Sequence, residues 1–291
     1  MRTKQRGSGW SIKAAYNLYK LFGYKFVYYL MYPAACFYYL KAKNVEDALA
    51  IYYEQIGLEF TKKRHFEHLR HFAVCMCDRF ISLADPKDYT FEIQNEEYLN
   101  SELEKGGILL LSHFGGWSTS ANCFGHLNLK MNVVMKEVLM RDIKKIEESI
   151  QTSGNSHLYV IDTGKGGIAS TLEIAEALRK NELVSIMADR PLSRKTAKKI
   201  NFFGKDALFN KNPFDIAYKM NKPLIAIYTS YIKPQTYKID YVKIEINKEN
   251  DMQKEVSLCM KTYVQKLESN IREYPQGWFN LYNFWETKIE D

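Results

Sequence analysis

A chain of 291 residues with 46% hydrophobic and 14% aromatic residues can bury a substantial core, which excludes an intrinsically disordered protein. The formal net charge of +7 favours negatively charged partners, such as anionic lipid, phosphate-bearing substrates, nucleic acid or an acidic carrier protein. The chain contains five cysteines without the spacing of a disulfide framework, which favours a reducing compartment over a secreted fold.

The N-terminal 45 residues contain no Asp or Glu but eight Lys and Arg side chains. The uncharged stretch between Lys25 and Lys41, FVYYLMYPAACFYYL, is shorter than the roughly 20 apolar residues that cross a bilayer. Its aromatic rings and flanking cations suit the headgroup interface. We therefore expect residues 1–84 to form a helical, membrane-associating region. A spanning helix and a core helix pair with a basic outer face remain alternatives.

Residues 85–291 are expected to form an α/β domain that is continuous with the N-terminal region. Short β-rich runs alternate there with helical periodicity, which predicts a mostly parallel central sheet flanked by helices. Strands are predicted over 107–112, 131–136, 157–162, 182–188 and 222–232, with an edge strand over 237–246. Helices are predicted over 46–84, 116–126, 140–152, 165–179, 212–221 and 250–273.

The stretch GILLLSHFGGWS ends a predicted buried strand in His113. Ligands bind beyond the carboxyl ends of parallel strands, so His113 is expected at the mouth of a crevice. Gly115 and Gly116 leave room for a close approach, and the amides of a following helix are expected to face the same space. A neutral imidazole there can act as a general base for acyl transfer. The alternative is a histidine that only caps the helix or bonds in the core.

Two further groups of residues carry charge or potential ligands. The run DRPLSRKTAKKINFFGK follows the strand that ends at Asp189, and Arg190 offers a planar fork suited to a phosphate or an acceptor headgroup. A solvated loop is the alternative for this run. His65, His68 and His71 recur every three residues. A solvated or interfacial helix face is favoured there over a metal site, and no metal site is expected.

At this point the sequence resembles the lysophospholipid acyltransferase superfamily, and within it the lipid A biosynthesis lauroyl- and myristoyltransferases. The resemblance covers most of the chain and rests on ordered blocks: LLLSHFGGWS, KNELVSIMADR, INFFGKDALFNKNPFDIAYKMNKPLIAIY and YPQGWFNLYNFWE. It implies a membrane-associated acyltransferase with His113 as general base. It also implies substrate contacts near Gly115, Gly116, Trp117, Glu137, Arg190, Phe203 and Gly204.

Ser118 departs from the family motif, in which Asp or Glu follows the histidine after four residues. The motif carboxylate bonds the imidazole and stabilises its charged form. Three explanations remain open. Another carboxylate supports His113, with Asp189 favoured over Glu137. Alternatively, Ser118 and a backbone carbonyl orient the ring, or the chain is a non-catalytic relative.

The resemblance implies transfer of a fatty acyl group from acyl carrier protein or coenzyme A to a lipid or glycolipid, without a further cofactor. The expected place is the cytoplasmic face of a bacterial inner membrane, in a monomeric or weakly associated protein. Nucleic acid is not expected as a partner, because no nucleic-acid-binding module accompanies the basic segments. A catalytically inactive lipid-binding or complex-forming relative is the main alternative, and a thioester hydrolase is a further one.

Overall fold

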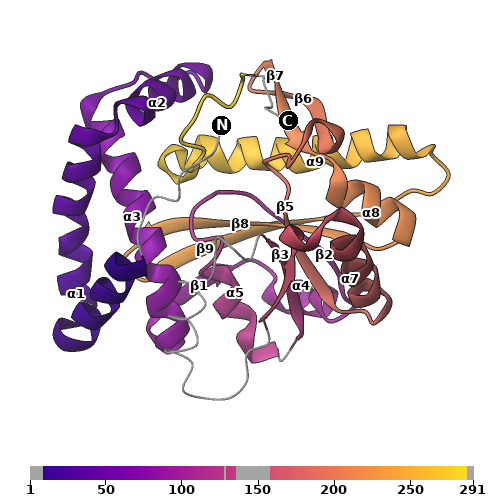
Figure 1. Cartoon of the computed structure of the whole chain (residues 1–291), viewed down its shortest axis with the longest axis horizontal. Helices are drawn as coiled ribbons and strands as arrows, with labels where there is room; N and C mark the ends of the chain where they lie inside the picture. Colours follow the sequence, from indigo (N-terminus) through magenta and orange to yellow (C-terminus); the bar gives the residue numbers. More distant parts are fainter. Residues whose placement is uncertain (1–8, 128, 136–157, 287–291) are drawn as a thin grey trace.

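The computed structural model describes residues 9–127, 129–135 and 158–286 (Figure 1). Its centre is a seven-stranded sheet in the order β1-β9-β8-β2-β5-β3-β4. The strands are β1 (Thr90–Ile93), β2 (Gly107–Leu111), β3 (Met131–Met135), β4 (Leu158–Asp162), β5 (Leu183–Met187), β8 (Leu224–Lys233) and β9 (Thr236–Ile244).

Five of the pairings between neighbouring strands are parallel, and only β8 and β9 run antiparallel. The predicted α/β class with a mostly parallel sheet is therefore confirmed. The prediction of an edge strand over 237–246 is wrong, because the short strand β1 pairs with β9 on its outer side. The alternating pattern of β9 reflects partial burial of one face rather than an edge position.

Helices cover both faces of the sheet. Ile108 and Leu110 of β2 pack into the core formed with α7, α8 and α9, whereas Leu109 packs against α4. Figure 1 shows the long helix α9 on one side of the strands and α4 with α5 on the other. The helices are α4 (Glu96–Leu103), α5 (Ser120–Cys123), α7 (Gly167–Arg179), α8 (Asn212–Met220) and α9 (Met252–Glu273).

Three N-terminal helices, α1 (Gly9–Lys41), α2 (Lys43–Gln55) and α3 (Lys62–Ala84), lie together at one side of the molecule (Figure 1). The backbone of α1 is kinked at Gly23, whose φ of 77° favours glycine. The uncharged stretch between Lys25 and Lys41 falls within α1. Within the ranges that the structure describes, no helix is long and apolar enough to cross a membrane.

The basic run after Asp189 begins as a loop, and its second part, from Ala197 on, forms a hairpin, which corrects the loop alternative for that part. Strands β6 (Ala197–Phe202) and β7 (Lys205–Asn210) pair antiparallel through a two-residue turn. Both turn residues have positive φ, 53° at Phe203 and 83° at Gly204, as tight hairpin turns require. Exposed Lys199 and Asn201 alternate with buried Ile200 and Phe202. Lys198 is partly buried, and its Nζ donates to Ser257 of α9.

Candidate active site

The carboxyl ends of two neighbouring strands bring His113 and Asp189 together. Leu111, the last residue of β2, is in register with Met187, the last residue of β5. His113 and Asp189 each lie two residues beyond these partners. The Ala188 amide also donates to the Leu111 carbonyl at 2.8 Å, so the two chains stay adjacent past the strand ends. Parallel pairing therefore places an imidazole beside a carboxylate.

The Asp189 carboxylate contacts both the backbone N–H and the ring of His113. The His113 Nδ1 atom lies 2.9 Å from Asp189 Oδ1 and 3.1 Å from Oδ2. The His113 backbone N–H donates to Oδ2 at 2.9 Å. Asp189 thus lies where the carboxylate of the family motif would be needed. Ser118 is partly buried, and no hydrogen bond joins it to His113 in the described part of the chain.

The protonation states of the pair follow from their surroundings. Burial opposes ionisation of Asp189, but attraction to His113 and Arg190 and hydrogen bonds from His113 outweigh it and keep its pKa below the ordinary value. Burial, together with the Arg190 charge, lowers the pKa of His113 in spite of Asp189. A neutral His113 beside an ionised carboxylate carries its proton on Nδ1, which leaves Nε2 as an acceptor.

The two side chains differ in their access to solvent. The Asp189 side chain is fully buried, whereas 23% of the His113 side chain is exposed. A substrate can therefore reach the imidazole but not the carboxylate. This difference in exposure suits His113 as a base whose imidazole is oriented by the buried carboxylate of Asp189.

The glycine amides after His113 are already bonded within the protein. Gly115 N–H donates to the Gly277 carbonyl at 2.7 Å, and Gly116 N–H donates to the Thr229 carbonyl at 2.8 Å. The helix expected over 116–126 starts later than predicted, because turns occupy 116–119 and α5 begins only at Ser120, followed by a 3-10 turn over Phe124–Leu127. Tight packing fixes both glycines: a Cβ at either position would clash, at Gly115 with the Thr229 carbonyl and at Gly116 with the Tyr237 ring.

Residues 277–280 close over the histidine segment. The Phe279 N–H donates to the His113 carbonyl at 2.7 Å, and Phe114 forms a β-bridge with Trp278. Trp117 lies beside both His113 and Phe279, with ring centroids 5.5 and 6.1 Å apart. Trp117 thus forms one wall next to the imidazole.

Arg190 faces this C-terminal segment. Its Nε donates to the Asn280 Oδ1 atom, and one Nη donates to the Phe279 carbonyl at 3.0 Å. Its guanidinium carbon lies 5.3 Å from the centre of the Tyr282 ring. Two sides of the guanidinium are thus bonded to protein, and a role in contacting a phosphate or headgroup stays a prediction.

Two of the other expected substrate contacts lie elsewhere. Phe203 and Gly204 form the hairpin turn described above. The Phe203 N–H donates to Glu268 and its carbonyl accepts from Gln55, which ties the turn to α9 and α2. Glu137 and the predicted helix 140–152 lie outside the described residues.

Of the three histidines of α3, His65 and His68 are buried and His71 is partly buried, so of the expected solvated or interfacial helix face the solvated alternative is wrong. His65 and His68 are at most 1% exposed. His68 contacts the Tyr53 hydroxyl at 3.2 Å and the Trp278 carbonyl at 3.0 Å, which links α3 to the segment over His113. In the ranges described, no group of three His, Cys, Asp or Glu side chains is arranged to hold a metal.

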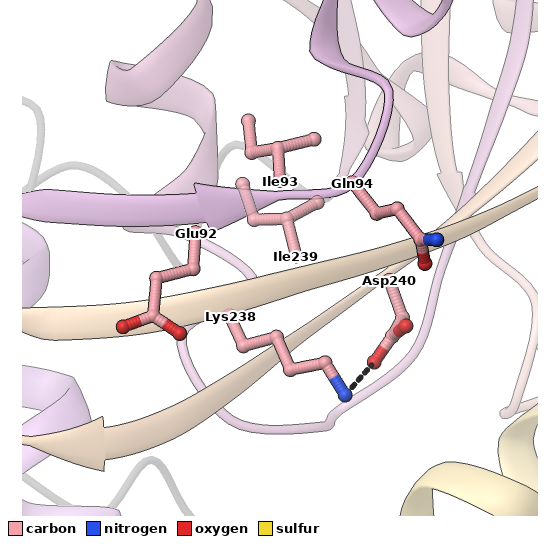
Figure 2. Close-up of a pocket in the computed structure, with 6 residues that line it drawn as sticks. All are labelled: Glu92, Ile93, Gln94, Lys238, Ile239 and Asp240. Atoms are coloured by element: carbon pink, nitrogen blue, oxygen red, sulfur yellow. Dashed lines mark ion pairs between the residues drawn. The ribbon is translucent and has the colours of Figure 1, made fainter.

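A surface pocket between β1 and β9 is separate from this pair (Figure 2). In it, Lys238 pairs with Asp240 at 3.3 Å. The lining residues are Glu92, Ile93, Gln94, Lys238, Ile239 and Asp240. None of them contributes to the His113 site.

A family model for bacterial lipid A biosynthesis acyltransferases matches residues 47–287. The chain belongs to this family. It is therefore an acyltransferase. The crystal structure of the 1-acyl-sn-glycerophosphate (LPA) acyltransferase PlsC from Thermotoga maritima is similar, with a TM-score of 0.39 and 9% identity over 85% of this chain and 97% of that one. The comparison with curated proteins finds no match.

Asn280 is the residue at this site that the sequence did not reveal. Its Nδ2 donates to Asp189 Oδ2 at 3.0 Å. Asn280 is 91 residues away from Asp189 in the sequence, in a segment whose many aromatics indicate only packing. The one available signal was a polar side chain between Phe279 and Leu281.

Proposed function

We propose that this acyltransferase moves a fatty acyl group from a thioester of acyl carrier protein or coenzyme A to a hydroxyl or amine of a lipid or glycolipid. The observation that carries the proposal is the hydrogen-bonded His113–Asp189 pair at the carboxyl ends of β2 and β5. Family membership supplies the reaction class.

His113 Nε2 accepts the proton of the acceptor group as that group attacks the acyl carbon. Asp189 stabilises the imidazolium that forms, as the carboxylate of a catalytic triad does. The tetrahedral intermediate collapses, the carbon–sulfur bond breaks, and the imidazolium returns the proton to the leaving thiolate. The products are an acylated acceptor and a free carrier thiol, and His113 ends neutral.

The contact between Asp189 and His113 also bears on the alternative of an inactive relative. Ser118 would leave the imidazole without a charged partner if no other carboxylate reached it. Asp189 lies 2.9 Å from Nδ1, so a carboxylate partner is available in spite of Ser118. This supports the enzyme over a lipid-binding relative without catalysis.

We further propose that α1 binds the cytoplasmic face of a bacterial inner membrane. Large apolar side chains are exposed along this helix, with Leu21 at 74% and Leu40 at 77%. Lys20, Lys25 and Lys41 provide cations for anionic headgroups. The other exposed apolar residues of α1 are Phe22, Phe26, Tyr29, Tyr32, Phe37 and Tyr38.

The exposed lysines of the hairpin region suit an anionic donor. Lys195, Lys199 and Lys205 are exposed on the chain that leaves the site after Asp189. Both an acidic acyl carrier protein and the phosphates of coenzyme A carry negative charge that these cations attract. This surface supports either donor for the proposed reaction.

The experiment that tests the proposed reaction is lipid mass spectrometry of cells that express wild-type protein or His113→Ala. Wild type is expected to produce an acyl-sized mass increase in one lipid class. Loss of the base is expected to slow turnover in isolated membranes by about 100- to 10,000-fold. Immunoblotting of the membrane fraction controls for protein level. Equal product formation by both proteins would contradict the role of His113.

A further inference from the structure

Asn280 lies between the only two charged groups that flank the imidazole in the described structure. It is 2% exposed. Its Nδ2 donates to Asp189 Oδ2 at 3.0 Å, and its Oδ1 accepts from Arg190 Nε. The amide orientation is determined by its neighbours, because an ionised carboxylate only accepts and a guanidinium only donates.

The hydrogen bonds on Asp189 leave its carboxylate little freedom to rotate. Oδ2 accepts from the His113 backbone N–H at 2.9 Å and from Asn280 at 3.0 Å. Oδ1 is then directed at His113 Nδ1, 2.9 Å away. Asn280 supplies the one side-chain contact to Oδ2 that does not come from His113 itself.

The same contacts form a closed ring. Arg190 donates to the Phe279 carbonyl, and the Phe279 N–H donates to the His113 carbonyl. Asn280 therefore connects the carboxylate both to a partly buried cation, Arg190, and to the C-terminal segment that bonds the histidine backbone. Any rotation of Asp189 would break a bond in this ring.

We propose that Asn280 is a positioning residue for acyl transfer: its side-chain amide holds the Asp189 carboxylate against His113 and links it to Arg190. The inference rests on the proposed function, since it concerns the same proton-transfer pair. Asn280 touches no reacting atom and acts through Asp189.

A residue that only fills space makes a different prediction. Asn280→Asp keeps the size of the side chain but replaces the amide donor with a second carboxyl group beside Asp189. Asn280→Ala removes the donor without adding charge. A packing role predicts that Asn280→Ala lowers stability the most and leaves the ionisation of His113 unaltered, whereas the charge added by Asn280→Asp acts on His113 whatever the role of Asn280.

The experiment follows the ionisation of His113 without relying on turnover. Diethylpyrocarbonate modifies neutral imidazole, so the rate at each pH, measured for the His113 peptide by mass spectrometry, gives the pKa of that residue. Asn280→Asp is expected to raise this pKa by about one unit, because added negative charge stabilises the imidazolium. Asn280→Ala is expected to lower it by about half a unit, because a carboxylate that is no longer held against the ring stabilises the imidazolium less.

The control is Asn201→Asp, the same change at an exposed turn of the hairpin whose side chain bonds Gly204. It is expected to leave the titration of His113 unchanged. The acidic limb of the pH dependence of kcat/KM should move in the same direction and by the same amount as the measured pKa of each variant. An unchanged or raised His113 pKa in Asn280→Ala overturns the proposal.

The outcome is separable from that of the proposed function. If His113→Ala retains full activity, the proposed base is wrong, yet the titration still shows whether Asn280 holds Asp189 against the ring. If Asn280→Asp does not fold, Asn280→Ala decides the matter alone by the presence or absence of its downward shift.

Discussion

His113 and Asp189 are 76 residues apart in the sequence, yet they share three contacts of 3.1 Å or less. The family motif places its carboxylate five residues after the histidine, on the same loop. Here the partner comes from the adjacent parallel strand and is sealed from solvent. The same electrostatic function can thus be supplied from a second strand, since the imidazole requires a nearby negative charge and not a particular sequence spacing.

Asp189→Asn separates the three explanations for Ser118. The amide cannot carry the negative charge that stabilises the imidazolium and can favour the wrong tautomer, so kcat is expected to fall by about four orders of magnitude. Ser118→Ala is expected to keep activity within about threefold, because no described hydrogen bond joins Ser118 to His113. Steady-state rates on the lipid acceptor measure both. Loss of activity in Ser118→Ala with little change in Asp189→Asn would reverse the assignment.

At the residue level, the sequence allowed the pair to be predicted but not the contacts around it. Asp189 was expected near His113 because both follow neighbouring buried strands. The bonded amides of Gly115 and Gly116 could not be foreseen, since their partners come from residues 277 and 229. The contact of Asn280 with Asp189 could not be predicted for the same reason. A contact between segments that are far apart in the sequence leaves no pattern in the residues of either segment.

At the level of helices and strands, the sequence-based predictions fail where the residue pattern of a strand does not show which strands pair with it. The run 237–246 alternates, but the four residues of β1 pair outside it. A strand of that length carries too little pattern to be recognised. Strand β6 was not predicted from the basic run 194–205, because Lys198 and Lys199 interrupt its apolar pattern. The buried strands β2 and β5, with continuous apolar runs, were the easiest to predict.

A buried carboxylate on α3 joins the N-terminal helices to the sheet. Asp78 is 1% exposed and accepts hydrogen bonds from Tyr89 at 2.9 Å and from Tyr237 at 2.5 Å. Tyr24 of α1 donates to it at 3.4 Å. Burial raises the pKa of Asp78 to about 6, and the tyrosines offset only part of this effect. The carboxylate thus connects α1, α3 and β9, and the free energy needed to keep it ionised in this buried place depends on pH.

Asp78→Asn is expected to change the pH dependence of stability. The folded pKa lies above the unfolded one, so between about pH 4 and 6 the folded state binds the extra proton and stability falls as pH rises. Relative to Asp78→Asn, wild type should lose up to about 3 kcal/mol of unfolding free energy from pH 4 to 7. Denaturant unfolding at several pH values measures this difference. The exposed Asp47→Asn change on α2 is the control, and a constant difference for Asp78→Asn would contradict the argument.

On the scale of the whole molecule, the N-terminal helices and the C-terminal segment meet around the site. Tyr52 of α2 donates to the Pro275 carbonyl at 2.7 Å, and His68 of α3 bonds the Trp278 carbonyl. The same C-terminal segment bonds His113 through Phe279. Hydrogen bonds therefore connect α2 and α3 to the His113 segment through the C-terminal segment. The division of the chain at residue 84 stays a prediction.

The family match begins at residue 47, within α2, so the role of α1 depends on its own surface. That surface combines exposed aromatic and aliphatic side chains with lysines, and its Tyr32 also packs against Phe66 and Arg70 of α3. Burying it in lipid headgroups would remove apolar area from water, and anionic lipid would attract the cations. Both contributions are measurable separately, because salt screens only the second.

The triple change Phe22→Ser, Phe37→Ser and Leu40→Ser is expected to weaken binding to anionic vesicles by about 100-fold, at roughly 1 kcal/mol for each apolar side chain removed. Co-sedimentation with vesicles at low and high salt measures the affinity. The salt dependence should persist in the variant, because Lys20, Lys25 and Lys41 are retained. Leu258→Ser, which changes an exposed leucine of α9, is the control and should bind as wild type does. If the triple variant binds as tightly as this control, α1 is not the membrane-binding surface, and the lipid acceptor must reach His113 by another face of the molecule.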